Sequence, residues 1–115
     1  MLNQQKGEEY MAANKIRMVA KEANGIVTVK AVINHPNESG FRKDEDGNFV
    51  PAHHLTEAEA KLNGQRLMQM QLGPSIAKNP LISFQFLGKK GDKLHVLFKD
   101  NKNEVFTADT EVVSA

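Results

Sequence analysis

The chain has 115 residues, of which 40% are hydrophobic and 25% are charged, and this is the composition of an ordinary folded domain. Fifteen basic and fourteen acidic residues leave a formal net charge of +1. The basic residues are spread along the chain, which gives no case for nucleic-acid binding. The absence of cysteine excludes disulfides, thiolate metal sites and thiol chemistry on this chain.

Neither a membrane span nor a secretory signal is readable in the sequence. Composition alone therefore predicts a cytoplasmic protein. The first residues are polar and precede a second methionine, Met11. We interpret residues 1–14 as a flexible N-terminal tail and residues 15–115 as the folded domain.

The first two predicted elements are strands, because apolar residues alternate with polar ones from Lys15 onward. The segment 16–21 places Ile16, Met18 and Ala20 on one face. After a turn at Asn24 and Gly25, the segment 27–33 shows the same period of two.

The segment 55–62 is ambiguous. Thr56 and Glu59 form a helix capping box, and the alanines, glutamates and lysine favour helix. However, apolar and charged residues alternate from Ala58 to Leu62, and the following Asn-Gly pair is typical of a tight hairpin turn into the segment 65–70. The sequence therefore predicts two further strands here.

Three more strands are predicted at 82–86, 94–98 and 106–112, separated by turn-forming residues. About seven short antiparallel strands predict an all-β, immunoglobulin-like sandwich. Two connections, 34–51 and 72–80, are too long to be tight turns. Both contain prolines and glycines that can fix one loop shape, and long loops on a rigid scaffold often bind partners.

The four histidines are the obvious metal candidates. His53 and His54 are adjacent on a predicted extended segment, so their side chains should point in opposite directions. His95 falls on the less apolar face of its strand. The spacing that includes His35 matches no structural zinc pattern, and we predict no metal site, with the histidines on the surface or hydrogen-bonded instead.

An alternative is a small periplasmic copper- or iron-binding β-sandwich that uses histidine and methionine ligands, because Met68 and Met70 lie on one strand face. The simpler interpretation is that these methionines fill gaps in the core. The serines occur in no nucleophile-elbow pattern, and the consecutive acidic residues 44–46 are typical of a solvated loop tip. We therefore predict no catalytic residues, no cofactor and no enzyme activity.

Two blocks of residues in the long loops and their flanking strands form a recognisable pattern. The first block contains His35, Pro36, Glu38, Gly40, Arg42, Asp44, Gly47 and Pro51. The second contains Asn63, Gly64, Gly73, Pro74, Asn79, Pro80, Phe84 and Phe86. With these blocks the chain resembles the Z subunit of the SoxYZ sulfur-oxidation carrier complex, from Lys15 to the C-terminus. The chain departs from the family pattern at Asn37, where methionine is expected, and at Ser39, where threonine is expected.

The resemblance implies a non-catalytic subunit of a heterodimer whose Y subunit bears the cysteine that carries sulfur intermediates. It also implies transient contacts with other Sox enzymes. In the family, the Y subunit's export signal carries both subunits to the periplasm, so the resemblance implies a periplasmic location that composition alone does not. Partner-binding residues are then expected among His35, Pro36, Glu38, Gly40, Arg42, Gly73, Pro74, Asn79 and Pro80.

Overall fold

The computed structural model describes residues 15–115, and the predicted tail, 1–14, lies outside the described residues. Nearly all of the regular structure is strand. The strands are β1 (Ile16–Ala23), β2 (Ile26–Ile33), β3 (Leu55–Leu62), β4 (Gln65–Gln71), β5 (Leu81–Leu87), β6 (Lys93–Asp100), β7 (Val105–Glu111) and β8 (Val113–Ser114). Within residues 15–115, no helix has the length and apolar character needed to cross a membrane.

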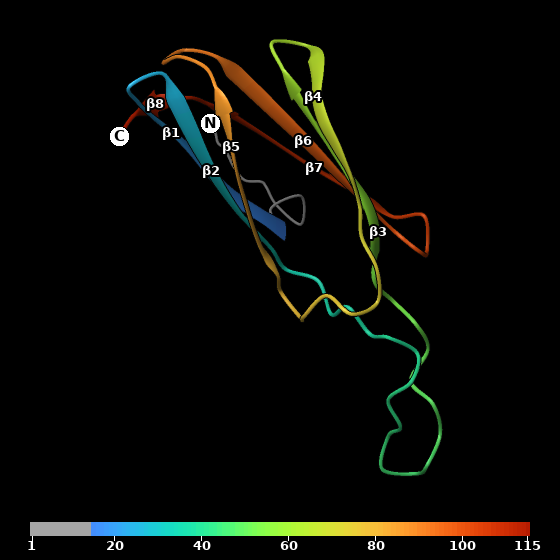
Figure 1. Cartoon of the computed structure of the whole chain (residues 1–115). Coiled ribbons are helices and arrows are strands. Elements are labelled where there is room, and N and C mark those ends of the chain that lie inside the picture. The colour runs from blue at the N-terminus through green and yellow to red at the C-terminus, as the bar shows by residue number, and fades with distance from the viewer. Residues whose placement is uncertain (1–14) are drawn as a thin grey trace, which may run out of the picture.

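The strands form two four-stranded sheets that face each other, as Figure 1 shows. One sheet has the order β5-β2-β1-β8 and the other has the order β4-β3-β6-β7. All pairs are antiparallel except β1 and β8, which are parallel. The predicted immunoglobulin-like β-sandwich is therefore confirmed. The short eighth strand was not predicted, because two residues are too few to show a periodic pattern.

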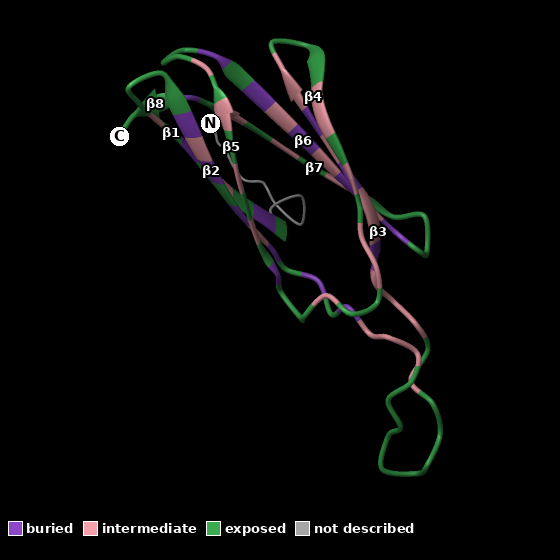
Figure 2. Cartoon of the chain, viewed as in Figure 1, coloured by how far each residue is buried: buried purple, intermediate pink, exposed green. Residues whose placement is uncertain are grey.

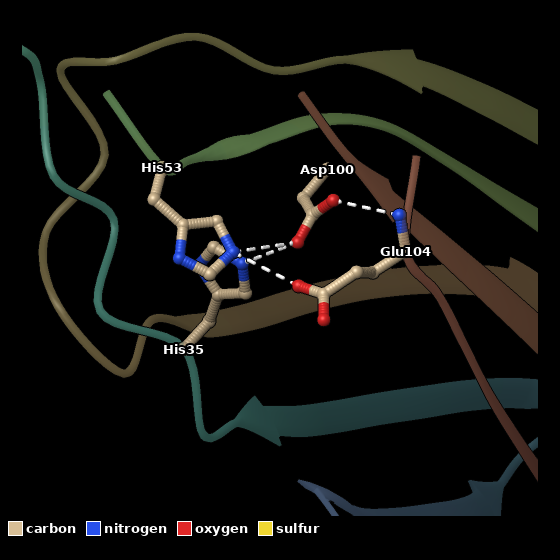
Figure 3. A group of neighbouring side chains, drawn as sticks. All are labelled: His35, His53, Asp100 and Glu104. Carbon is tan, nitrogen blue, oxygen red and sulfur yellow. Dashed lines mark hydrogen bonds and ion pairs between the residues drawn. The ribbon is translucent and has the colours of Figure 1, made fainter. Parts of the chain in front are cut away.

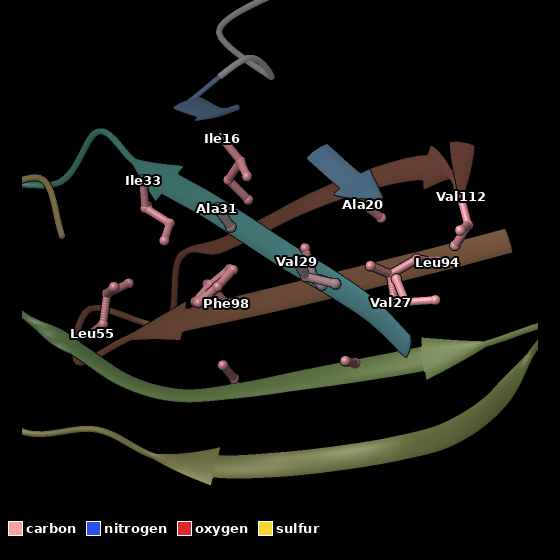
Figure 4. Packing of buried hydrophobic residues seen from close by; sticks show 13 residues of the cluster. Ile16, Ala20, Val27, Val29, Ala31, Ile33, Leu55, Leu94, Phe98 and Val112 are labelled. Atoms are coloured by element: carbon pink, nitrogen blue, oxygen red, sulfur yellow. The ribbon is translucent and has the colours of Figure 1, made fainter. Parts of the chain in front are cut away.

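The core lies between the sheets and is built from the faces that alternation predicted. β2 contributes Val27, Val29, Ala31 and Ile33, each no more than 1% exposed. Across from them, β6 contributes a second row of buried apolar residues, as Figure 4 shows. Full burial of a valine- or leucine-sized side chain contributes about 1.5–3 kcal/mol, so the buried rows of these two central strands contribute substantially to the stability of the sandwich.

The ambiguous segment is strand β3. It pairs with β4 on one side and with β6 on the other, and its Ala58 and Ala60 are buried. Two sets of ladder hydrogen bonds and burial of the alternate side chains outweigh the local helix propensity, which amounts to only tenths of a kcal/mol for each residue.

A long extension leaves the sandwich between β2 and β3 (Figure 1). It makes the molecule elongated, with extents of 52 × 32 × 22 Å along its principal axes. We call residues 38–53 the arm. The arm is an irregular hairpin, held by antiparallel bridges from Glu38 to His53 and from Lys43 to Phe49. At its tip the carboxylate of Asp44 accepts hydrogen bonds from two backbone N–H groups of the turn. Its outer part is exposed, as Figure 2 shows.

Candidate functional site

A polar cluster closes the end of the sandwich from which the arm projects. His35 follows the end of β2, His53 closes the base of the arm, and Asp100 ends β6. Glu104 lies in the turn between β6 and β7. These four side chains point toward one another (Figure 3), and His35 and Asp100 are each only 1% exposed.

The Asp100 carboxylate is the centre of this cluster. Its Oδ2 lies 3.1 Å from Nε2 of His35 and 2.9 Å from Nε2 of His53. Its Oδ1 accepts hydrogen bonds from the backbone N–H groups of Lys102, at 3.0 Å, and Glu104, at 2.8 Å. Nε2 of His53 also lies 3.0 Å from Oε1 of Glu104. Each oxygen of Asp100 therefore has its own set of partners.

Electrostatics keep Asp100 ionised despite its burial. Burial disfavours the charged carboxylate, but hydrogen bonds with His35, Glu104 and His53 outweigh this effect and hold the pKa of Asp100 far below its ordinary value. A fixed negative charge thus contacts Nε2 of two imidazole rings, which themselves meet edge to face with their centroids 4.6 Å apart.

Asn37 links the cluster to both long loops. It is buried and has a positive φ of 48°, a conformation that asparagine tolerates better than most residues. Its Oδ1 accepts a hydrogen bond from the backbone N–H of Leu55 at 3.0 Å, and its Nδ2 donates to the carbonyl of Ala77 at 2.9 Å. Asn37, where the resemblance leads us to expect methionine, therefore makes specific polar contacts.

Asn79 and Pro80 join the second loop to the first. Oδ1 of Asn79 accepts a hydrogen bond from the backbone N–H of His35 at 3.0 Å, and the N–H of Asn79 donates to the carbonyl of His35 at 2.9 Å. The carbonyl of Pro80 accepts from the N–H of Ile33 at 3.1 Å. The two loops that the sequence analysis singled out are therefore in direct contact at their bases.

The arm presents two aromatic side chains to solvent. Phe41 is 80% exposed and Phe49 is 61% exposed. Nζ of Lys43 lies 5.1 Å from the centroid of the Phe49 ring. Arg42 forms a bidentate ion pair with Glu38, in which Nη2 lies 2.7 Å from Oε2 and Nε lies 3.0 Å from Oε1. The hydrogen bond from Arg42 lowers the pKa of Glu38. Aromatic and arginine side chains together are typical of protein interfaces.

Gly40 allows the two sides of the arm to approach each other closely near its base. It has a φ of +92°, and a Cβ at this position would lie 3.1 Å from the Cβ of Ala52 on the opposite side of the arm. A larger residue would be strained in its backbone and would crowd the facing segment.

The nine predicted partner-binding residues divide by exposure. His35 and Pro80 are buried, so they can affect a partner only by holding the loops in shape. The exposed ones are Pro36, Arg42, Pro74 and Asn79, while Glu38, Gly40 and Gly73 are half-buried.

The remaining histidines do not join the cluster. His54 contacts its own backbone neighbour, the carbonyl of Leu55, rather than Asp100, and so diverges from His53 as predicted. His95 pairs with Asp109 at 2.8 Å on an outer face of the sandwich. Met68 and Met70 pack against the core, as the simpler interpretation of these residues predicted.

Sequence reasoning did not find Asp100, Glu104, Phe41 or Phe49. The residues between β6 and β7 form the turn that the sequence predicts, but Asp100, just before this turn, also directs its carboxylate into the protein. The sequence carries no signal for this contact, because it follows from strand register in the structure: the pairing of β3 with β6 places Asp100 opposite Leu55, which is two residues after His53.

Together, the two facing sheets, the polar cluster and the arm define an immunoglobulin-like β-sandwich protein with one elaborated end. Residues 16–111 match the family described as Sulphur oxidation protein SoxZ. Because this match covers most of the chain, the chain belongs to the SoxZ family, and membership supports a role in sulfur oxidation. No curated protein matches the chain at a significant level.

Solved structures with a similar fold include superoxide reductases. The superoxide reductase (neelaredoxin) from Ignicoccus hospitalis has 20% identity and a TM-score of 0.62, over 88% of this chain and 81% of that one. The superoxide reductase from Nanoarchaeum equitans has 11% identity and a TM-score of 0.62, over 90% and 95%. The reduced enzyme from Archaeoglobus fulgidus has 16% identity and a TM-score of 0.59, over 85% and 88%. At these identities the likeness shows the sandwich fold alone.

Proposed function

We propose that this chain is the non-catalytic Z subunit of a SoxYZ heterodimer, which carries covalently bound sulfur intermediates during thiosulfate oxidation. The observation that carries the proposal is the family match over residues 16–111, which includes both long loops. In this proposal the complex works in the periplasm, where the chain arrives by export together with its Y-like partner.

The chemistry divides between the two subunits. A sulfur intermediate is carried on a thiolate, which is the nucleophilic form of cysteine. This chain has no cysteine, so the covalent step belongs to the Y-like partner. The role left to this chain is to bind the partner and to help dock the enzymes that act on the carried sulfur.

The arm is the surface that we assign to docking. Phe41 and Phe49 offer exposed apolar area, and Arg42 adds a guanidinium group that Glu38 holds in place. The base of the arm is fixed by Asn37 and by the bridge between Glu38 and His53. A surface that is already ordered loses little conformational entropy when a partner binds.

Co-expression with a Y-like subunit tests the heterodimer. The two chains should elute together from a size-exclusion column at micromolar concentration, because a stable interface of standard size gives a submicromolar Kd. Elution of each chain as an independent monomer would overturn the proposal.

A further inference from the structure

The four-residue cluster at the base of the arm has the composition of a metal site. Two imidazole nitrogens and two carboxylate oxygens, one from each of His35, His53, Asp100 and Glu104, all lie within 4.8 Å of one another. They come from three segments of the chain that are brought together by the fold, as Figure 3 shows. Such a set of nitrogen and oxygen ligands suits zinc.

The spacing of these atoms also fits a tetrahedral ion. Ligands bound to zinc at about 2.0–2.1 Å lie about 3.3 Å from one another at the corners of a tetrahedron. The separations from Asp100 to His35, from Asp100 to His53 and from Glu104 to His53 are 3.1, 2.9 and 3.0 Å. These three separations need to lengthen by only a few tenths of an ångström, whereas the other three, which are at most 4.8 Å, would shorten as the half-exposed Glu104 side chain and the His53 ring close around the ion.

Hydrogen bonds outside this group orient the ligands. The backbone N–H groups of Lys102 and Glu104 hold Oδ1 of Asp100, which leaves Oδ2 facing the imidazoles. Nδ1 of His35 lies 3.1 Å from Oδ1 of Asn37. In the metal-free chain Nδ1 also accepts a hydrogen bond from the backbone N–H of Asn37 at 3.2 Å, which places the ring proton on Nε2, toward Asp100. Zinc bound to Nε2 would move that proton to Nδ1, where Oδ1 of Asn37 lies within reach as its acceptor.

The orientation of Asn37 is itself fixed. Its Oδ1 accepts from the N–H of Leu55 and its Nδ2 donates to the carbonyl of Ala77, so the oxygen, and not the amide nitrogen, faces the ring of His35. This arrangement is the one that zinc-binding histidines commonly have, with a carbonyl oxygen behind the ligand.

The charges balance and the site is accessible. The two carboxylates supply two negative charges for a divalent cation, and the imidazoles bind in their neutral form. His35 and Asp100 are buried, whereas the Glu104 side chain is 50% exposed and that of His53 is 22% exposed. An ion can reach the cluster from the side of Glu104.

We propose that His35, His53, Asp100 and Glu104 form a zinc-binding site that fastens the base of the arm to the end of the sandwich. Imidazole ligands disfavour magnesium and calcium, and the tetrahedral spacing favours zinc over copper(II). This inference goes beyond the carrier role. Its failure would leave the heterodimer prediction unaffected, because partner binding is measured separately.

Calorimetric titration of the untagged, chelator-treated full chain with zinc chloride tests the site. One zinc per chain should bind, and zinc at a hundredfold excess over its Kd should raise the Tm by roughly 10 °C. Cobalt(II) bound at the same site should give the intense visible absorption of tetrahedral coordination. Absence of binding at 100 µM zinc, or octahedral cobalt spectra, would overturn the proposal.

Matched variants locate the site. His53→Ala and Glu104→Ala remove the two partly exposed ligands, so the chain should still fold, and each should weaken zinc binding more than tenfold. His95→Ala is the control, because it removes a histidine from a comparable pair with Asp109 on the outer face. Equal zinc affinity in the wild-type chain and in the His53 and Glu104 variants would contradict the assignment.

Discussion

Asn37 illustrates how a single side chain sets the local architecture of this protein. Its amide group contacts the start of β3 and the second loop, and its oxygen faces the ring of His35. Asparagine can both adopt the positive φ of 48° and supply an acceptor and a donor. The conformation of the first long loop is therefore tied to the side chain of Asn37.

Replacement of Asn37 by alanine should destabilise the protein by about 2–4 kcal/mol. The change removes the acceptor for the backbone N–H of Leu55, a residue that is fully buried, and it forces alanine into the left-handed region. Urea unfolding at equilibrium measures the difference.

Asn24→Ala provides the control for backbone strain. Asn24 has a similar φ of 55°, but it lies in the exposed β1–β2 turn and its side chain forms none of the hydrogen bonds found among residues 15–115. Its variant should lose only about 1 kcal/mol. If the two variants were equally destabilised, the buried hydrogen bonds of Asn37 would make no measurable contribution to the free energy of unfolding.

At the level of elements, alternation predicted the strands well because each strand has one face in a single core. The rows in β2 and β6 are buried as predicted, and the segment around Ala58 and Ala60 is a strand. β3 shows that pairing on both edges can override helix propensity.

The polar cluster could not be predicted in the same way. Alternation says which face of a strand is apolar, but not which loop residues meet at a sheet end. His35 and Asp100 are 65 residues apart, and their contact depends on the β3–β6 register and on the turn after β6. The arm was foreseen as a long connection, but the exposure of Phe41 and Phe49 depends on a conformation that sequence alone does not give.

The two exposed aromatic side chains of the arm lead to a separate prediction about partner binding. The double variant Phe41→Ser and Phe49→Ser should weaken binding to the Y-like subunit or to a docking enzyme by more than tenfold, because aromatic anchors commonly dominate interface energetics. Stability should change little, since both rings are largely exposed. Surface plasmon resonance measures the affinity, and thermal unfolding measures the stability.

Leu87→Ser is the matched control for the arm. Leu87 is 82% exposed and pairs with Ile26 at the start of β2, whereas the arm follows the end of that strand. Loss of an exposed apolar side chain at this opposite end should leave binding unchanged. The docking assignment would be wrong if this variant weakened binding as much as the arm variant did, or if the arm variant bound normally.

At the level of the whole molecule, one end of the sandwich carries the polar cluster, the junction of the two loops and the arm. The sheets provide a rigid support, and the cluster determines how the arm leaves it. Loops held on a rigid scaffold are typical of binding surfaces, and this agrees with the docking role that we propose for the arm.

Intact-mass spectrometry under native conditions tests the central claim most directly. This chain and its Y-like partner are first exposed to thiosulfate and the Sox enzymes. This chain should then be recovered in a one-to-one complex with the partner. The masses added by sulfur intermediates should be found only on the cysteine-bearing partner, and this chain should keep the mass of its sequence. Recovery of this chain without a partner, or sulfur adducts on this chain itself, would contradict the account.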